Sequence, residues 1–284
     1  MKKYVLKSLF IAALAVIALS GCKKEKEEEI DKDTATAEDN ALFEKTYNDA
    51  NDIADQAAAN NSLTSFRIGD NASALSHCAI ITHDTISNPH VLTIDFGSTN
   101  CLGHDGRSRR GQIIVTYSGA YRDSASTHTI TFNNYYVTHY INNIAHEFHV
   151  EGSKTVTNMG HNSSGHLYFN IQVNGLITNS ANQQRSWTSS RQREWIQGES
   201  TSSWGDDIYL ITGSASGTSF AGRAFTVTIL TPLRVDLSCR YIVSGSFRLT
   251  IQDRPDRTLD YGNGTCNNIA TVTINNHTFT IYLH

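Results

Sequence analysis

Two nine-residue stretches of the sequence share one pattern: TIDFGSTNC at Thr93–Cys101 and TLDYGNGTC at Thr258–Cys266. Each reads Thr, Ile or Leu, Asp, an aromatic residue, Gly, three small or polar residues, and Cys. A further cysteine precedes each stretch, Cys78 for the first and Cys239 for the second. An aspartate before a glycine is typical of a turn in which the carboxylate accepts hydrogen bonds from the backbone. The repeated pattern therefore predicts a β protein with two related corners, each held by its own disulfide.

Residues 1–21 have the pattern of a bacterial lipoprotein signal peptide. Three lysines precede an apolar run at residues 9–19, which is too short to span a membrane comfortably. The run ends in LSGC at residues 19–22, which resembles the cleavage site of bacterial lipoproteins. The resemblance implies cleavage before Cys22 and attachment of acyl chains such as palmitate to this residue. The alternative is an ordinary signal peptide followed by an incidental cysteine.

Residues 22–35 are predicted to form a charged tether. A block with so many Lys and Glu residues cannot bury apolar surface and stays solvated, so it would lift the rest of the chain off the membrane. It also resembles the export signal of surface lipoproteins in the Bacteroidetes, and Asp33-Thr34-Ala35 resembles their O-glycosylation triplet, with Thr34 as the acceptor. The formal net charge is −4, and loss of the three signal-peptide lysines makes it −7. We therefore expect no basic surface for nucleic acid.

The remaining sequence predicts one helix followed by a single β domain. Residues 36–61 place apolar side chains on one broad helical stripe, and Thr36 and Asp39 have the spacing of a capping box. This helix would be a lid on the body or a stalk, with partner binding as the alternative. Residues 75–284 contain short strand-like runs, with a hairpin predicted at Asn174–Gly175. The expected fold is all-β, a mostly antiparallel sandwich with an internal pseudo-repeat and one N-terminal helix.

The cysteine count indicates two disulfides. Of the five cysteines, Cys22 is assigned to the lipid, and the other four allow three pairings. We favour Cys78–Cys101 with Cys239–Cys266, because the twin motifs make this the symmetric choice. Zinc binding is the weaker alternative, since no Cys-x2-Cys spacing occurs and an exported protein meets an oxidising compartment.

The stretch from residue 185 to 204 contains all three tryptophans, interspersed with arginines. One interpretation is an amphipathic strand pair with tryptophan toward the core and arginine outside. The other is an exposed platform for a sugar or peptide, because tryptophan faces stack on apolar sugar faces and guanidinium groups add bidentate contacts. The residues of this possible platform are Trp187, Arg191, Arg193, Trp195 and Trp204.

The sequence offers little for catalysis. Asp95 and Asp260 could act as the acid and base of a glycosidase, but their places in the twin motifs favour a structural role as turn caps. The spacing of His146 and His149 does not match a zinc-protease motif. No nucleophile elbow, phosphate loop or dinucleotide fingerprint occurs. We therefore predict no catalytic residue, cofactor or resident metal.

The combination of the lipoprotein cleavage site, the acidic tether and the motifs at residues 106–113 and 259–268 resembles a group of uncharacterised outer-membrane lipoproteins of the Bacteroidetes. The resemblance covers most of residues 75–284 and implies no activity. It implies a protein anchored by lipid in the outer membrane, facing the cell surface or the periplasm. We expect a non-catalytic binding or structural module that contacts a glycan or a protein partner. The alternative is a hydrolase that acts on polysaccharides.

Overall fold

A computed structural model describes residues 33–60, 75, 78–103, 105–141, 144–201, 205–239 and 241–283. Cys22, the signal peptide and most of the tether lie outside these residues. The one helix of this part of the chain is α1 (Ala35–Asn60). The strands are β1 (Ile80–Asp84), β2 (His90–Asp95), β3 (Cys101–Leu102), β4 (Ser108–Tyr117), β5 (Thr127–Ile141), β6 (Ile144–His161), β7 (Leu167–Asn179), β8 (Gln184–Gln197), β9 (Ile208–Thr218), β10 (Ala224–Asp236), β11 (Ile242–Ile251), β12 (Arg257–Asn263), β13 (Ile269–Ile274) and β14 (His277–Tyr282).

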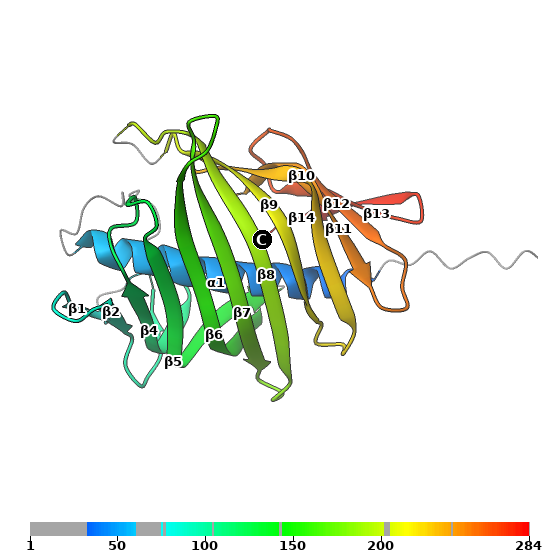
Figure 1. The fold of residues 1–284 in the computed structure, drawn as a ribbon. Coiled ribbons are helices and arrows are strands. Elements are labelled where there is room, and N and C mark those ends of the chain that lie inside the picture. Colours follow the sequence, from blue (N-terminus) through cyan, green and yellow to red (C-terminus); the bar gives the residue numbers. More distant parts are fainter. Residues whose placement is uncertain are drawn as a thin grey trace, which may run out of the picture. The chain divides into compact units, whose positions relative to one another are not determined.

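All the strands belong to one antiparallel sheet of 14 strands, which confirms the all-β class with a single N-terminal helix. Apart from β3, which pairs with β4 alone, each strand lies beside the next in the chain, from β1 to β14. The expected sandwich would have a second sheet. Here the second layer is α1 instead, which lies across the strands on one face of the sheet (Figure 1). We call this face the inner face and the opposite one the outer face.

Helix α1 forms part of the hydrophobic core. Its fully buried side chains recur every three or four residues, as one face of a helix requires; they are Phe43, Tyr47, Ala50, Ile53 and Ala57. The helix is therefore packed on the body, which is the first of the two expected roles, and it is not a stalk. The predicted capping box is wrong, because α1 begins at Ala35, whose N–H donates to Asp33 Oδ1 at 3.0 Å. Asp39 accepts a hydrogen bond from the Phe220 N–H instead, at 2.7 Å.

Tyr47 joins the middle of α1 to the middle of the sheet. Its hydroxyl donates to the Glu151 carbonyl at 2.7 Å and accepts from the Leu176 N–H at 2.8 Å. A Cβ at Gly175 would collide with the Tyr47 ring and hydroxyl, so the close approach requires glycine there. The predicted hairpin at Asn174–Gly175 is therefore wrong: β7 continues through both residues, and the glycine serves the contact with the helix.

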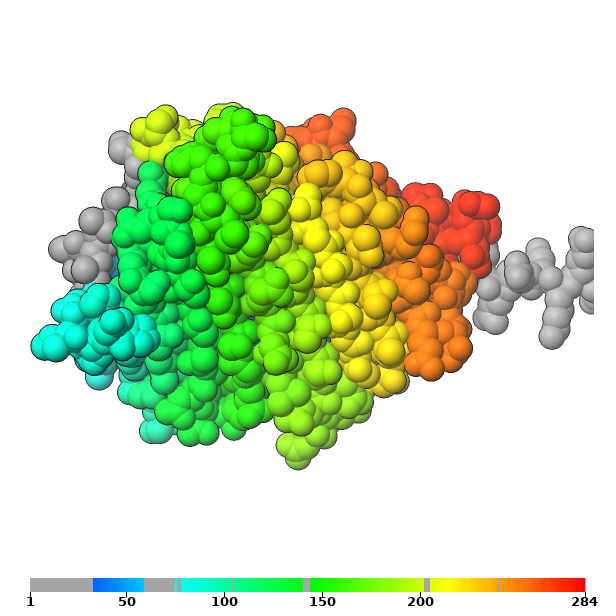
Figure 2. All heavy atoms as spheres, viewed as in Figure 1, coloured from blue at the N-terminus to red at the C-terminus, as the bar shows by residue number. Residues whose placement is uncertain are grey.

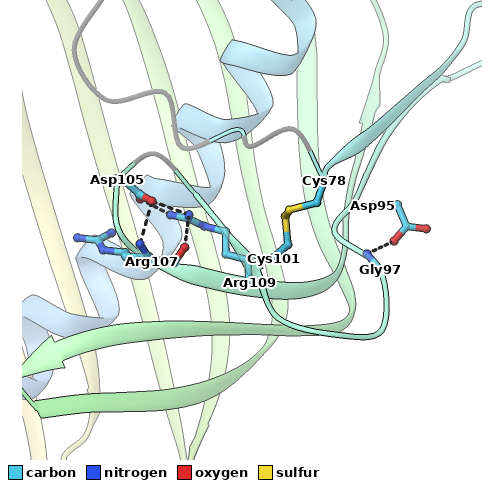
Figure 3. The surroundings of a disulfide bond; sticks show 7 residues. All are labelled: Cys78, Asp95, Gly97, Cys101, Asp105, Arg107 and Arg109. Atoms are coloured by element: carbon cyan, nitrogen blue, oxygen red, sulfur yellow. Dashed lines mark hydrogen bonds and ion pairs between the residues drawn. A yellow bond between two sulfur atoms is a disulfide. The ribbon is translucent and has the colours of Figure 1, made fainter.

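Both cysteine motifs close a hairpin. In the first, β1 pairs with β2, and Cys78 before the hairpin bonds to Cys101 after it. In the second, β11 pairs with β12, and Cys239 bonds to Cys266 in the same way. The disulfides therefore have the predicted pairing, and the two hairpins have the same order of elements. Figure 3 shows the first of them.

The pattern shared by the twin stretches gives the same contact between aspartate and glycine in both, at the end of β2 and within β12. Asp95 Oδ1 accepts a hydrogen bond from the Gly97 N–H at 2.7 Å, and Asp260 Oδ1 accepts one from the Gly262 N–H at 2.7 Å (Figure 3 for the first). Gly97 and Gly262 have φ angles of 78° and 90°, which glycine adopts most readily. The turn-capping role that the sequence predicts for the two aspartates is therefore present.

Removal of the Tyr47 hydroxyl tests the contact between α1 and the sheet. In Tyr47→Phe, the Glu151 carbonyl and the Leu176 N–H lose their partner inside the protein, so we expect the free energy of unfolding to fall by about 1–3 kcal/mol. Urea unfolding of the purified protein measures this loss. Tyr168→Phe, on the opposite face of β7, is the control and should change stability by less than about 0.5 kcal/mol. Equal losses in the two variants would contradict this account.

Candidate functional site

The predicted Trp and Arg platform is not an exposed surface. Trp187 and Trp195 are only 2% and 3% exposed. The Trp187 ring stacks on Tyr47 at 5.9 Å between centroids, and its Nε1–H donates to Asn40 Oδ1 at 3.0 Å. These tryptophans belong to the core between β8 and α1. Trp204 lies outside the described residues.

The two arginines of the platform are on the inner face as well, so the interpretation that places them outside is wrong. Arg191 is 5% exposed, and its Nη2 lies 3.4 Å from Glu44 Oε2 of α1. The Arg193 guanidinium lies 5.1 Å from the ring centroids of both Phe169 and Tyr209. Side chains alternate between the faces of a strand, and residues 187, 191, 193 and 195 are all odd-numbered and point the same way.

The other candidate residues from the sequence are Asp95, Asp260, Thr34 and His146. Asp95 and Asp260 occupy separate turns, and strands β4 to β11 lie between their strands in the sheet. Thr34 precedes α1, and its hydroxyl donates to Glu38 Oε1 at 2.7 Å. His146 pairs with His139 across β5 and β6, and no group of three or more His, Cys, Asp or Glu in the described part of the chain could hold a metal ion.

A cavity of about 260 Å³ lies between the second half of α1 and the strands β1, β2, β4 and β5. Its walls are formed by one helix and one end of the sheet, together with the β4–β5 connection. We call it the histidine cavity. It is lined by Asn51, Ala54, Asp55, Ala58, His83, Thr85, His90, Leu92, Val115, Tyr117, Gly119, Ala120, Tyr121, His128 and Ile130.

The sheet register builds the wall of the histidine cavity in two rows. One row consists of His90, Tyr117 and His128, which lie side by side on β2, β4 and β5. The second row is aliphatic and lies two residues further along the same strands, at Leu92, Val115 and Ile130. The alternation of side chains turns both rows toward α1, so short sequence motifs on three strands create one aromatic and one aliphatic strip.

Aromatic rings surround Tyr117. The His83, His90 and His128 ring centroids lie 5.6, 5.2 and 5.6 Å from that of Tyr117. His83 Nε2 and the Tyr117 hydroxyl are hydrogen-bonded. Tyr121 adds an edge-on contact to His128 at 5.4 Å. His90 Nδ1 and His128 Nε2 are buried without a hydrogen-bond partner within the described protein, so the wall has polar atoms to offer a ligand.

Asp55 of α1 faces this wall and carries the charge of the cavity. Burial, followed by repulsion from Asp52, raises the pKa of Asp55 to about 7. Asn51 Nδ2 donates to Asp55 Oδ2 at 2.8 Å. Asp52 is exposed and does not line the cavity, so Asp55 is the one acidic group among the described lining residues. An acid with such a pKa lacks an adequate cationic partner.

His83 and His128 do not supply that cation at neutral pH. Burial lowers the pKa of both His83 and His128 from the usual value of histidine, so both rings are neutral at pH 7. None of the described lining residues is a lysine or an arginine. Lys154 and Arg193 lower the pKa of Asp55, but both lie outside the lining. The cavity therefore offers a poorly compensated carboxyl group opposite aromatic rings.

Sequence reasoning missed this cavity because it comes from four strands and a helix that are far apart in the chain. A weak signal exists in the strands. His90 and Leu92, Val115 and Tyr117, and His128 and Ile130 each place an aromatic ring two residues from an aliphatic side chain. That spacing predicts a shared face within each strand, but not that the three strands are neighbours.

Comparisons of the chain with known protein families, with curated proteins and with solved structures found no match. In the part of the chain that the structure describes, no helix has the length and apolar character needed to cross a membrane. The geometry of the histidine cavity is therefore the basis for an argument about function.

The raised pKa of Asp55 predicts how stability depends on pH. The folded protein holds a proton on Asp55 up to about pH 7, whereas the unfolded chain loses it near pH 3.8, so ionisation opposes folding as pH rises through this window. We expect the free energy of unfolding of the wild type to fall relative to that of Asp55→Asn between pH 4 and pH 7, so the advantage of the variant is larger at pH 8 than at pH 5. Urea unfolding at both pH values measures the difference.

Asp256→Asn in the exposed β11–β12 connection is the matched control and should show no such change between the two pH values. A wild-type Asp55 that ionises near pH 4 in a carboxyl titration by NMR would overturn this account of the cavity.

Proposed function

We propose that this protein is a lipid-anchored, non-catalytic binding module of the cell envelope, and that it holds a small organic cation in the histidine cavity. The observation that carries the proposal is the position of Asp55, a partly buried carboxyl group with a raised pKa that faces a wall of aromatic rings. An ammonium or guanidinium group would supply the positive charge that the described lining residues lack.

Three features of the cavity favour a cation over an anion. The faces of Tyr117 and Tyr121 carry partial negative charge and attract cations. The lining residues of α1 come from its second half, where the helix dipole is negative. The carboxyl group of Asp55 adds formal negative charge once ionised. All three features would repel an anion.

The volume of the cavity limits the ligand. Pockets that enclose drug-sized molecules measure roughly 300–1,000 Å³, and this cavity of about 260 Å³ lies just below that range. It fits a group such as trimethylammonium or a short alkylamine, either as a free molecule or as one end of a longer one. The aliphatic row at Leu92, Val115 and Ile130 would contact the alkyl part.

The expected membrane anchor and the separation of Asp95 from Asp260 in the sheet support a capture role at the envelope. The cleavage-site sequence at residues 19–22 and the charged tether are typical of a lipid-anchored protein whose body extends from the membrane. The alternative of a polysaccharide hydrolase rests on Asp95 and Asp260, and their use as caps of separate turns disfavours it.

Titration of the purified protein with tetramethylammonium and with butylammonium chloride, followed by calorimetry or NMR, tests this proposal. We expect saturable binding that strengthens from pH 5 to pH 8, because Asp55, with its pKa of about 7, must ionise to bind a cation. Asp55→Asn and Tyr117→Leu should each weaken binding at pH 8 at least about tenfold, which corresponds to about 1.4 kcal/mol. Asp256→Asn should bind as the wild type does. Equal binding by all four proteins, or none by the wild type, would contradict a cation site in this cavity.

The lipid anchor is tested through Cys22. In a bacterial host fed an alkyne analogue of palmitate, the wild-type protein should carry the label and sediment with the membranes. Cys22→Ala should lose both properties, because no other residue of the LSGC sequence has a sulfur to acylate. Lys24→Ala in the tether is the control and should be labelled normally. Full labelling of Cys22→Ala would refute the anchor and leave the cation site untouched.

A further inference from the structure

The centre of the outer face consists almost entirely of hydroxyl and amide side chains. They lie on β6 to β10, on the face of the sheet that Figure 2 views. We call this surface the hydroxyl face. Its residues are Ser153, Thr155, Gln172, Asn174, Thr188, Ser190, Ser214, Ser216, Thr226 and Thr228.

The register of the strands arranges the hydroxyl face in two parallel rows. One row runs Thr155, Gln172, Ser190, Ser214, Thr228, each residue directly opposite the next on the neighbouring strand. The second row runs Ser153, Asn174, Thr188, Ser216, Thr226 in the same way. Neighbours within a row are about 4.8 Å apart, and the rows are about 6.6 Å apart, as the geometry of a sheet dictates.

The hydroxyl face carries no charge along a groove of about 670 Å³. None of the described residues that line this groove is Asp, Glu, Lys, Arg or His. A soluble surface usually has roughly 25–35% Lys, Arg, Glu and Asp, so a groove of this size without them is unusual. Lys154 of β6 and Arg191 of β8 point to the inner face, and the outward-facing Glu151 of β6 and Glu194 of β8 lie beyond the groove.

Contacts between the side chains hold parts of the hydroxyl face in place. Gln172 Nε2 donates to Ser190 Oγ at 2.8 Å, and the Thr188 and Ser216 hydroxyls are 2.9 Å apart. A hydroxyl has one donor and two acceptor positions, so these groups keep further hydrogen-bonding capacity toward solvent or a ligand. The opposite side of the same strands packs on α1, which keeps the two rows rigid.

The composition of the hydroxyl face excludes most classes of macromolecule. Nucleic acid needs lysine and arginine to neutralise phosphates. A membrane surface needs apolar anchors or basic residues. A stable protein interface has an aromatic and aliphatic centre. An uncharged ligand that presents its own closely spaced hydroxyl groups matches all these features.

We propose that the hydroxyl face binds an uncharged polysaccharide chain that lies across β6 to β10. Successive sugar hydroxyls would exchange hydrogen bonds with successive residues of the two rows, and the uncharged groove would not repel them. This site is independent of the histidine cavity, because its residues point to the opposite face of the sheet.

Native gel electrophoresis through gels that contain a soluble polysaccharide tests this proposal. We expect at least one of three uncharged polymers, a mixed-linkage glucan, a xylan or a galactomannan, to retard the wild-type protein, whereas polyanionic alginate should not. The variant combines Thr188→Val, Thr226→Val and Thr228→Val, which keep the shape and the strand propensity of threonine but remove three hydroxyls. We expect it to lose affinity at least tenfold.

Two matched variants separate this site from everything else. The pair Thr82→Val and Thr93→Val makes the same change on the outer face of β1 and β2, outside the groove, and should be retarded normally. Asp55→Asn should be retarded normally too, since it affects the cavity alone. No retardation of the wild type by any of the uncharged polymers would overturn the proposal, and so would equal retardation of the triple variant with an unchanged melting temperature.

Discussion

The fold depends on the contact between α1 and the inner face of the sheet. A single-layered sheet has no core, and α1 supplies the missing layer with one apolar stripe that includes Phe43 and Tyr47. The contact is specific as well as apolar. The Tyr47 hydroxyl forms hydrogen bonds with two backbone groups of the sheet, and Gly175 leaves room for the Tyr47 side chain. Without the helix, these groups and the aromatic rings of β8 would face water.

The same contact explains an unusual distribution of charge. Arg109, Lys154 and Arg191 are at most 5% exposed, although such residues are normally on the surface. They can be buried because each contacts an acidic or polar group. Asp105 accepts a hydrogen bond from Arg109 at 2.9 Å, and in α1 Glu44 contacts Arg191 and Asn48 contacts Lys154. Since α1 is rich in acids, the cations are drawn to the inner face. The groove on the outer face of β6 to β10 has no charged residue in its described lining, and this neutrality is the basis of the polysaccharide proposal.

Local patterns predicted local structure in part: the capping box at Thr36 and Asp39 and the hairpin at Asn174–Gly175 did not form, whereas the cysteine motifs did. The motif around Asp95 and Asp260 predicted the capped turns, because a side chain that caps a turn acts within a few residues. The similarity of the two motifs predicted the disulfide pairing. The position of α1 and the cavity could not be predicted in this way, since they depend on which distant strands are neighbours. Arg191 and Arg193 were misplaced for another reason. Their even spacing from Trp187 puts them on the same face of β8 as Trp187, but burying a cation is costly unless it has a partner such as Glu44. The sequence does not show which helix residue faces β8.

The two corners show how one local motif can serve different ends. Both hairpins are closed by a disulfide and a capped turn, so each is rigid whatever packs on it. The first hairpin, β1–β2, carries His83 and His90. Together with Asp55 in the second half of α1, these residues line the histidine cavity. The second includes Arg257, which is 2% exposed and lies against the Asp33 carbonyl at the start of α1. A guanidinium fills the space there, and the backbone oxygen accepts its hydrogen bonds. The cation is thus part of the chain at one corner. At the other, none of the described lining residues is a lysine or an arginine, and the proposed ligand site rests on this asymmetry.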